Sequence, residues 1–379
     1  MKKTISLLLI FTLVFALAGC GGSSAPAPAP PAPSPSEPTP AAPAPTTPAT
    51  PAPSEPTAPA APTTAWNPDN IRNQTFILGH GQGETSQVGV QYHEFALAVE
   101  DLSGGKMKVE ERIAGTLVTD TETLDAILDN VIDFAHSMGS YVTGLVTDLS
   151  PLTIAGYYGG DDWNGFADGI FDLVSNIYGD YHIKYVAPLY QGNSYIACTA
   201  KQIKVPGDVA GLTFRASGTW VSKTVDAWGG AAVTIGLADL ADAFSKNAVQ
   251  GVATGMNIIV PFKIYEVAKY ITFTSISEGF AALLMSGDTW DRLNADEQAL
   301  IMEAGKIFQH KAYDIAIENI GVYENTIVSE GKNEVYTLSD SEQKQFIERA
   351  YSVYNEMEGE LGPKGLQLIG ILKDINGIS

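Results

Sequence analysis

Apolar residues recur along the chain with two alternating spacings between residues 74 and 135. Period-two or continuous apolar runs predict strands, and a period near 3.6 predicts helices packed on one face. The pattern predicts strands at residues 74–78, 106–113 and 131–135, and helices at residues 88–102 and after the capping box Thr119-x-x-Glu122. This β-α-β-α-β order favours parallel strands joined by crossover helices.

The alternation resumes further along and predicts a second α/β unit. The expected elements are helices at residues 166–178, 219–228 and 237–244, strands at 182–187, 195–199 and 212–215, a long helix over 288–329, and closing helices at 339–358 and 365–372. About 310 residues from Trp66 onward are enough for two units of ordinary size. We therefore expect an α/β protein.

The first residues predict an export signal. Lys2 and Lys3 precede an apolar run over residues 5–18, and Leu17-Ala-Gly-Cys20 follows. This segment, residues 1–20, is typical of a lipoprotein signal whose cleavage leaves a lipidated Cys20, and multiple acylation gives stable membrane anchoring. The alternative is an ordinary cleaved signal in which Cys20 has no role.

Residues 21–66 are almost wholly Ala, Pro, Ser and Thr, and they hold 16 of the 22 prolines. Such a tract cannot bury enough apolar surface to fold, and its prolines favour an extended chain of roughly 3.1 Å per residue. We expect a linker of up to about 130 Å between a membrane anchor and the folded part of the chain.

Charge and chemistry-bearing residues narrow the function. The formal net charge of −21 argues against nucleic acid as a partner. Cys198 is the only cysteine left after Cys20 and is expected to be buried, and the five histidines show no metal-binding or catalytic spacing. No nucleophile motif and no dinucleotide-binding loop occurs, so we expect neither catalysis nor a cofactor nor a resident metal.

The most informative motif is residues 205–215, because an apolar strand there ends on Arg215. A guanidinium is permanently charged, and its planar donors match a carboxylate in two parallel hydrogen bonds. The motif reads P-x-D-x-x-G-L-x-x-R, and it is followed by NAVQG at residues 247–251 and YEVAKY at residues 265–270. An apolar strand that ends on an arginine indicates an anionic ligand, and the alternative is a structural salt bridge.

This succession of motifs resembles the DctP-type extracytoplasmic solute-binding proteins of tripartite ATP-independent periplasmic (TRAP) transporters. The resemblance implies a two-lobed, periplasmic-binding-protein-like architecture, with a ligand cleft between the lobes and a long shared helix. The lobe ranges that we expect are residues 67–192 for lobe 1, 193–280 for lobe 2, 281–322 for the return to lobe 1 with the long helix, and 323–379 for closing helices, mainly of lobe 2.

In the family, the arginine that matches Arg215 clamps the ligand carboxylate. Many members carry a second arginine at the position of Tyr195, or of its neighbour Ser194. The ring and hydroxyl of Tyr195 are instead expected to contact a neutral or aromatic part of the ligand. The missing cation therefore favours a monocarboxylate over a dicarboxylate. The family pattern V-D-G-x-E-N is also changed here, so Thr254 or the nearby Asn257 is expected to offer a polar group to the ligand.

Other departures concern the walls of the cleft. Residues 237–241 lack the aromatic residues that the family tends to carry, which leaves room for a bulky apolar or aromatic ligand group, with Trp220 or Trp163 as a wall. The loop after the first strand borders the cleft in the family, so His80 and Gln82 are candidate ligand contacts. His136, at the end of the third strand, is the remaining candidate.

These observations together predict a lipid-anchored receptor on the outer face of the cell membrane. It would bind a small organic carboxylate as a monomer and deliver it to the membrane permease of a TRAP transporter, which is driven by an ion gradient. One alternative is a ligand receptor for a membrane sensor. Another is a metal-binding receptor that uses His80 and His136, and an enzyme of some α/β class is the third.

Overall fold

The structure is a computed structural model that describes residues 66–156 and 162–378. The predicted signal, Cys20 and the linker up to residue 65 therefore lie outside the described residues. The described residues all belong to one compact unit. None of the described helices is both long and apolar enough to cross a membrane.

Five strands form the first half of a mixed sheet, in the order β2-β1-β3-β9-β4. Their bounds in that order are Met107–Arg112, Gln74–Gly79, Phe134–Met138, Glu278–Ser286 and Ile183–Cys198. β2, β1 and β3 are parallel, whereas β9 is antiparallel to both of its neighbours. The prediction of parallel strands within residues 74–135 is therefore confirmed, although the third strand begins three residues later than residue 131.

β9 was not predicted because its sequence does not alternate. Ala281, Leu283 and Met285 belong to one buried cluster, while the residues between them belong to another. Both faces of β9 are thus covered, and a strand that is buried on both faces reads as a continuous apolar run.

β4 is 16 residues long and belongs to both halves of the sheet. It pairs with β9 as far as Asn193, and residues 194–198 pair with β7 and β8. The pairing register shifts between Tyr190 and Asn193, where Gly192 has a φ of +91° that favours glycine. The two strands predicted at residues 182–187 and 195–199 are therefore one strand with a bulge between them.

The second half of the sheet lies on both edges of this last part of β4. On one edge follow β7 (Gly251–Gly255), β5 (Thr213–Ala216) and β6 (Ala231–Thr234), and on the other β8 (Tyr270–Phe273) and β10 (Glu334–Thr337). β5 is parallel to both β6 and β7. Arg215 thus lies on a strand with a neighbour on each side.

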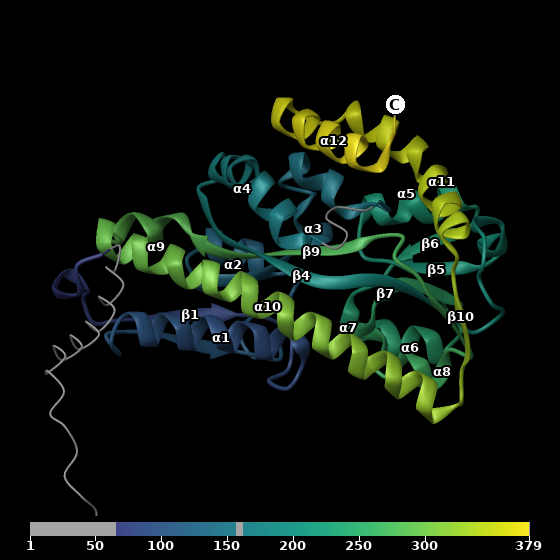
Figure 1. The fold of residues 1–379 in the computed structure, drawn as a ribbon, viewed down its shortest axis with the longest axis horizontal. Helices are drawn as coiled ribbons and strands as arrows, with labels where there is room; N and C mark the ends of the chain where they lie inside the picture. The colour runs from purple at the N-terminus through teal and green to yellow at the C-terminus, as the bar shows by residue number, and fades with distance from the viewer. Residues whose placement is uncertain (1–65, 157–161, 379) are drawn as a thin grey trace, which may run out of the picture. The chain divides into compact units, whose positions relative to one another are not determined.

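The helices cover both halves (Figure 1). The helices that lie between β1 and β4 in the chain are α1 (Gln87–Leu102), α2 (Thr123–Leu128), α3 (Gly139–Val142) and α4 (Trp163–Gly179). Those between β5 and β8 are α5 (Thr219–Trp228), α6 (Leu240–Ser245), α7 (Met256–Ile259) and α8 (Ile264–Val267). The remaining helices are α9 (Gly287–Arg292), α10 (Ala295–Glu330), α11 (Asp340–Glu358) and α12 (Pro363–Asn376).

The long helix α10 packs against elements of both halves, namely α1, β4 and α7 (Figure 1). Its 36 residues span about 54 Å at 1.5 Å per residue. The predicted helix over 288–329 is interrupted at Leu293, because Asn294 caps a new helix by accepting from the N–H groups of Asp296 and Glu297. α11 packs on α5, whereas α12 packs on α4 and residues 147–153. The predicted lobe boundaries themselves stay a prediction.

Candidate functional site

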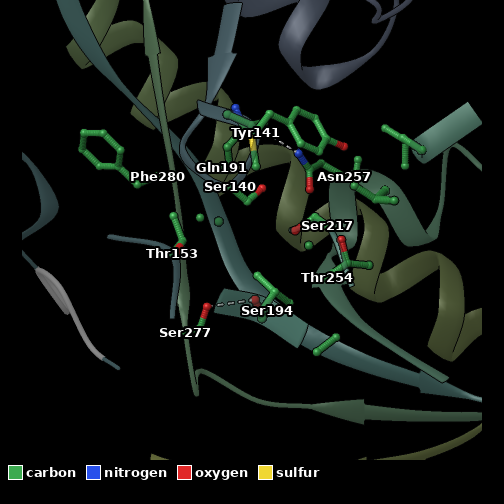
Figure 2. A pocket seen from close by; sticks show the side chains of 18 of the residues that line it. Ser140, Tyr141, Thr153, Gln191, Ser194, Ser217, Thr254, Asn257, Ser277 and Phe280 are labelled. Atoms are coloured by element: carbon green, nitrogen blue, oxygen red, sulfur yellow. Dashed lines mark hydrogen bonds between the residues drawn. The ribbon is translucent and has the colours of Figure 1, made fainter. Parts of the chain in front are cut away.

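A cavity of about 140 Å³ is lined by residues from both halves of the sheet. From the first half come Gln82, Asp120 and His136, and from the second half come Arg215, Thr254 and Asn257. Figure 2 shows several of the smaller polar side chains around this space: Ser140, Thr153, Ser194, Ser217, Thr254 and Ser277. Hydroxyl groups can donate or accept, so the wall offers hydrogen bonds of both kinds.

Arg215 is the only Lys or Arg among the described residues that line the cavity. Its side chain is buried, at 5% exposure, and Nε donates to the carbonyl oxygen of Ile235 at 2.8 Å. Nη2 lies 3.4 Å from the Tyr141 hydroxyl, and no carboxylate in the described part of the chain forms an ion pair with Arg215. A buried guanidinium that is held in place but lacks an acidic partner is a ready binding group for an anion.

Gly251 fixes the strand that carries Arg215. It lies opposite Phe214 in the β5–β7 pairing, and a Cβ atom there would be 2.4 Å from the Phe214 ring. This close approach explains why the NAVQG motif ends on glycine.

We expect Gly251→Ala to lower the free energy of unfolding by about 1–3 kcal/mol, the usual cost of overpacking a core. Urea unfolding measures the change. Gly321→Ala is the matched control, because a Cβ at Gly321 in α10 meets nothing within 4 Å and alanine favours the helix. Equal stability of Gly251→Ala and the wild-type protein would show that β5 and β7 can separate without cost.

A pair of amides lies at the bulge of β4. Nδ2 of Asn257 donates to Oε1 of Gln191 at 2.8 Å, and both side chains are buried (Figure 2). Cβ atoms at Gly255 and Gly279 would lie 2.2 Å from Asn257 Oδ1 and 2.5 Å from Gln191 Cβ. The two glycines therefore make room for the amide pair beside the cavity.

On the first-half side, two histidines and a tyrosine form a buried group. His80 stacks on Tyr92, and Nδ1 of His136 is 3.0 Å from the Tyr92 hydroxyl. Burial, and then the neighbouring His136, lower the pKa of His80 to about 4, against an opposing effect of Asp120. Burial also lowers the pKa of His136. Both rings are therefore neutral at pH 7.

The structure places five of the predicted contact residues at the cavity: Gln82, His136, Arg215, Thr254 and Asn257. Three others do not line it. Tyr195 is buried on the opposite side of β4, where its hydroxyl donates to Glu324 at 2.6 Å, and its neighbour Ser194 lines the cavity instead. His80 is buried against Tyr92, and Trp220 is buried in the core cluster that also holds Trp163.

Among the lining residues that we did not predict are Asp120, Tyr141 and Gln191. Asp120 lies inside the Thr119-x-x-Glu122 sequence, which we read only as a helix start. A glycine within a strand often marks a bulge, where a neighbouring side chain can be redirected. Gly192 was therefore the sequence signal that could have indicated Gln191 as a lining residue. Tyr141 had no signal that we could identify.

Two α/β halves that share the continuous strand β4 and the long helix α10, with a cavity lined by both halves, define the two-lobed fold of solute-binding proteins. Solved structures with this fold include a periplasmic solute-binding protein of a TRAP transporter from Sulfitobacter sp. NAS-14.1 with bound β-D-galacturonate. That protein is 19% identical, and the match covers 79% of this chain and 100% of the other chain, with a TM-score of 0.74. A Bordetella pertussis extracytoplasmic solute receptor that binds pyroglutamic acid is 15% identical. The match covers 79% of this chain and 99% of the receptor, with a TM-score of 0.73.

The family model described as bacterial extracellular solute-binding protein, family 7 (DctP) matches residues 78–360. The chain belongs to this family, as the sequence motifs predicted. A curated relative is the C4-dicarboxylate-binding protein DctB of Bacillus subtilis, 22% identical over 79% of this chain and 87% of the relative. The ectoine/5-hydroxyectoine-binding periplasmic protein UehA of Ruegeria pomeroyi is 21% identical over 65% of this chain and 76% of its own length.

Proposed function

We propose that this chain is the receptor subunit of a TRAP transporter and binds a small organic monocarboxylate between its lobes. The observation that carries the proposal is Arg215, a buried cation without an acidic partner in the described part of the chain. Solved relatives contain bound succinate, malonate and β-D-galacturonate, which supports a carboxylate as the ligand class.

The cavity supports the finer choice of a monocarboxylate. Only one cation lines its described wall, and a second carboxylate would face side chains without positive charge. A water-sized group needs about 10–15 Å³ of such space, so a cavity of about 140 Å³ has room for on the order of ten non-hydrogen atoms. Met138, Val221, Leu237 and Ile258 add apolar surface for the body of the ligand.

In this proposal Cys20 carries the lipid anchor and residues 21–66 hold the folded part away from the membrane. Ligand bridges the two lobes, and the permease recognises the closed state. The chain acts as a monomer and a receptor, not as an enzyme. Delivery to a membrane sensor would use the same site.

A metal-binding receptor has less support. His136 lines the cavity but His80 does not, and the residues described contain no group of three or more His, Cys, Asp or Glu side chains that could hold a metal ion.

The test is a thermal-shift screen of the purified full chain in detergent against carboxylic acids, each paired with its neutral amide. A ligand with a micromolar Kd at millimolar concentration stabilises the native state by about 4 kcal/mol, so we expect a Tm increase of several degrees with the acid only. Stabilisation by the amides, or by metal ions without an acid, would contradict the proposed ligand class.

A further inference from the structure

The first-half wall of the cavity carries a negative charge. Asp120 lines the cavity, and its carboxylate accepts from the Gly81 N–H at 2.6 Å and from Gln82 Nε2 at 2.5 Å. Neither donor is charged, and no Lys, Arg or His in the described residues forms an ion pair with Asp120. A carboxylate oxygen can accept more than one hydrogen bond, so Asp120 keeps acceptor capacity for a ligand.

His136 adds a second acceptor to the same wall. The Tyr92 hydroxyl has a single proton and donates it to the carbonyl oxygen of Ala282 at 3.0 Å. Nδ1 of His136, 3.0 Å from that hydroxyl, must therefore carry the proton of this contact. With the ring neutral, Nε2 is left as a lone-pair acceptor, and it has no partner among the described residues.

The second-half wall has the opposite character, because Arg215 contributes donors and a positive charge. The described wall of the cavity thus contains one cation and one anion, which come from different halves of the molecule and do not pair with each other. A dicarboxylate would satisfy Arg215 but would bring its second charge to a wall that includes Asp120, where like charges repel.

We propose that the ligand carries, besides the carboxylate bound by Arg215, a cationic or N–H donor group that is bound by Asp120 and His136. The ligand class is then an amino acid or a related zwitterion. This inference rests on the proposed function and refines it. A ligand with both groups would contact charges on both halves at once, whereas a simple acid would contact only one of them.

The test uses three probes that share a four-carbon chain: 4-aminobutanoate, butanoate and succinate, extended to matched sets of other lengths and to α-amino acids. Calorimetric titration of the full chain measures each Kd. We expect the amino acid of the fitting length to bind at least 30-fold more tightly than its deaminated acid and than its dicarboxylate, as for a desolvated charge pair.

Asp120→Asn is the decisive variant, because an amide still accepts from Gly81 N–H and a rotated Gln82 amide can accept from the new NH2 group. We expect it to lose about 30-fold or more in affinity for the amino acid and to bind the deaminated acid within about 3-fold of wild type. Asp125→Asn, an exposed position in α2 with no side-chain bond to another described residue, is the matched control.

The outcomes separate the two proposals. If no carboxylate binds the wild-type protein, the proposed function is wrong. If carboxylates bind but the amino group brings no gain, or Asp120→Asn leaves amino-acid affinity unchanged, only this inference is wrong. A dicarboxylate that binds tightly with Ca²⁺ and is released by a chelator would also overturn it, because Asp120 would then be a metal ligand.

Discussion

Replacing Arg215 with alanine is expected to weaken carboxylate binding by about 2–5 kcal/mol, which corresponds to roughly 30-fold to several-thousand-fold in Kd. The guanidinium is buried, is positioned by Ile235 O and Tyr141, and keeps Nη1 without a partner among the described residues. Calorimetric titration with the best acid from the screen measures the loss. Arg215→Lys keeps the charge but not the planar fork, so we expect it to fall between alanine and wild type.

Two controls keep this prediction specific. Arg349→Ala removes an exposed arginine of α11 that has no side-chain bond to another described residue, and it should leave the Kd unchanged. Thermal melting without ligand must show that Arg215→Ala is folded. Retained affinity in a folded Arg215→Ala protein would mean that Arg215 has only a structural role.

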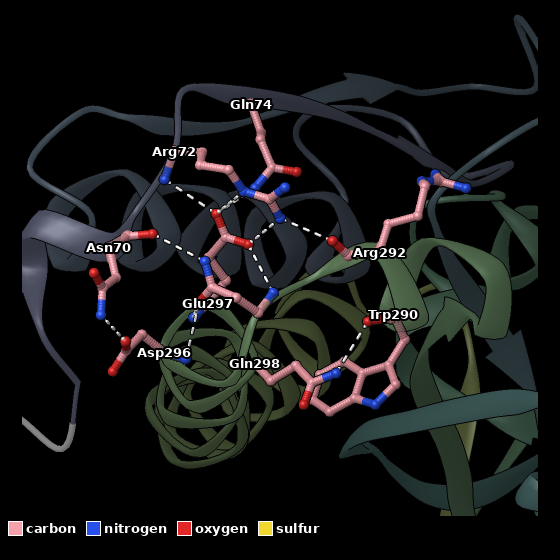
Figure 3. A network of polar contacts seen from close by, with 9 residues as sticks. Asn70, Arg72, Gln74, Trp290, Arg292, Asp296, Glu297 and Gln298 are labelled. Carbon is pink, nitrogen blue, oxygen red and sulfur yellow. Dashed lines mark hydrogen bonds and ion pairs between the residues drawn. The ribbon is translucent and has the colours of Figure 1, made fainter.

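The second large effect is expected at Glu297, in the first turn of α10. Its side chain is fully buried and accepts from Nε and Nη2 of Arg72 at 2.8 and 2.5 Å (Figure 3). Gln74 Nε2 and the backbone N–H groups of Arg72 and Asn294 also donate to it. This carboxylate joins the start of β1 to the start of the long helix.

We expect Glu297→Ala to lower the free energy of unfolding by about 1–3 kcal/mol, because five hydrogen bonds from the described residues lose their buried acceptor, while the Arg72 side chain, which is 54% exposed, can bond to water instead. Urea unfolding of the full chain measures it. Glu318→Ala, at an exposed position of the same helix, is the matched control and should change stability by less than about 0.5 kcal/mol. A similar small change in both variants would contradict the assigned role of Glu297.

The same residue predicts a pH dependence. Burial by itself raises the pKa of Glu297, but the hydrogen bonds from Arg72 and from the N–H groups of Asn294 and Arg72 outweigh it and hold the pKa below 4.5. A depressed pKa contributes stability that is fully present above the unfolded value and is lost as the pH falls through the folded value. The stability difference between wild type and Glu297→Ala should therefore narrow below about pH 4.5.

The sequence predicted elements best where their ends carry local signals. α5 begins and ends at the predicted residues because Gly218 precedes it and Gly229, at a φ of +98°, stops it. β9 was missed, and the two predicted parts of β4 were not joined, for a different reason. Their pairing joins residues about 85 apart in sequence, Asn193 with Glu278, and apolar residues on both faces remove the alternation by which strands are recognised.

In the candidate site too, residues with a local sequence signal were predicted, and residues placed by contacts between distant parts of the chain were not. Arg215 was found because a charge on an apolar strand needs a partner. Tyr195 was placed on the wrong side of β4, because adjacent strand residues point to opposite faces and a one-residue difference in register exchanges them. Asp120 and Gln191 come to the cavity through tertiary contacts with Gly81 and Asn257, which no local pattern contains.

The shared strand β4 and the place of β9 in the sheet also bear on the order of events during folding. Neither half can complete its sheet from one continuous stretch of chain, since β9 must insert between β3 and β4, and Gln91 of α1 donates to Ala312 O of α10 more than 200 residues later. Contacts between such distant residues close slowly. We expect the newly made chain to stay without a finished core until α10 has been synthesised, a delay during which an exported protein remains free to be threaded through a membrane.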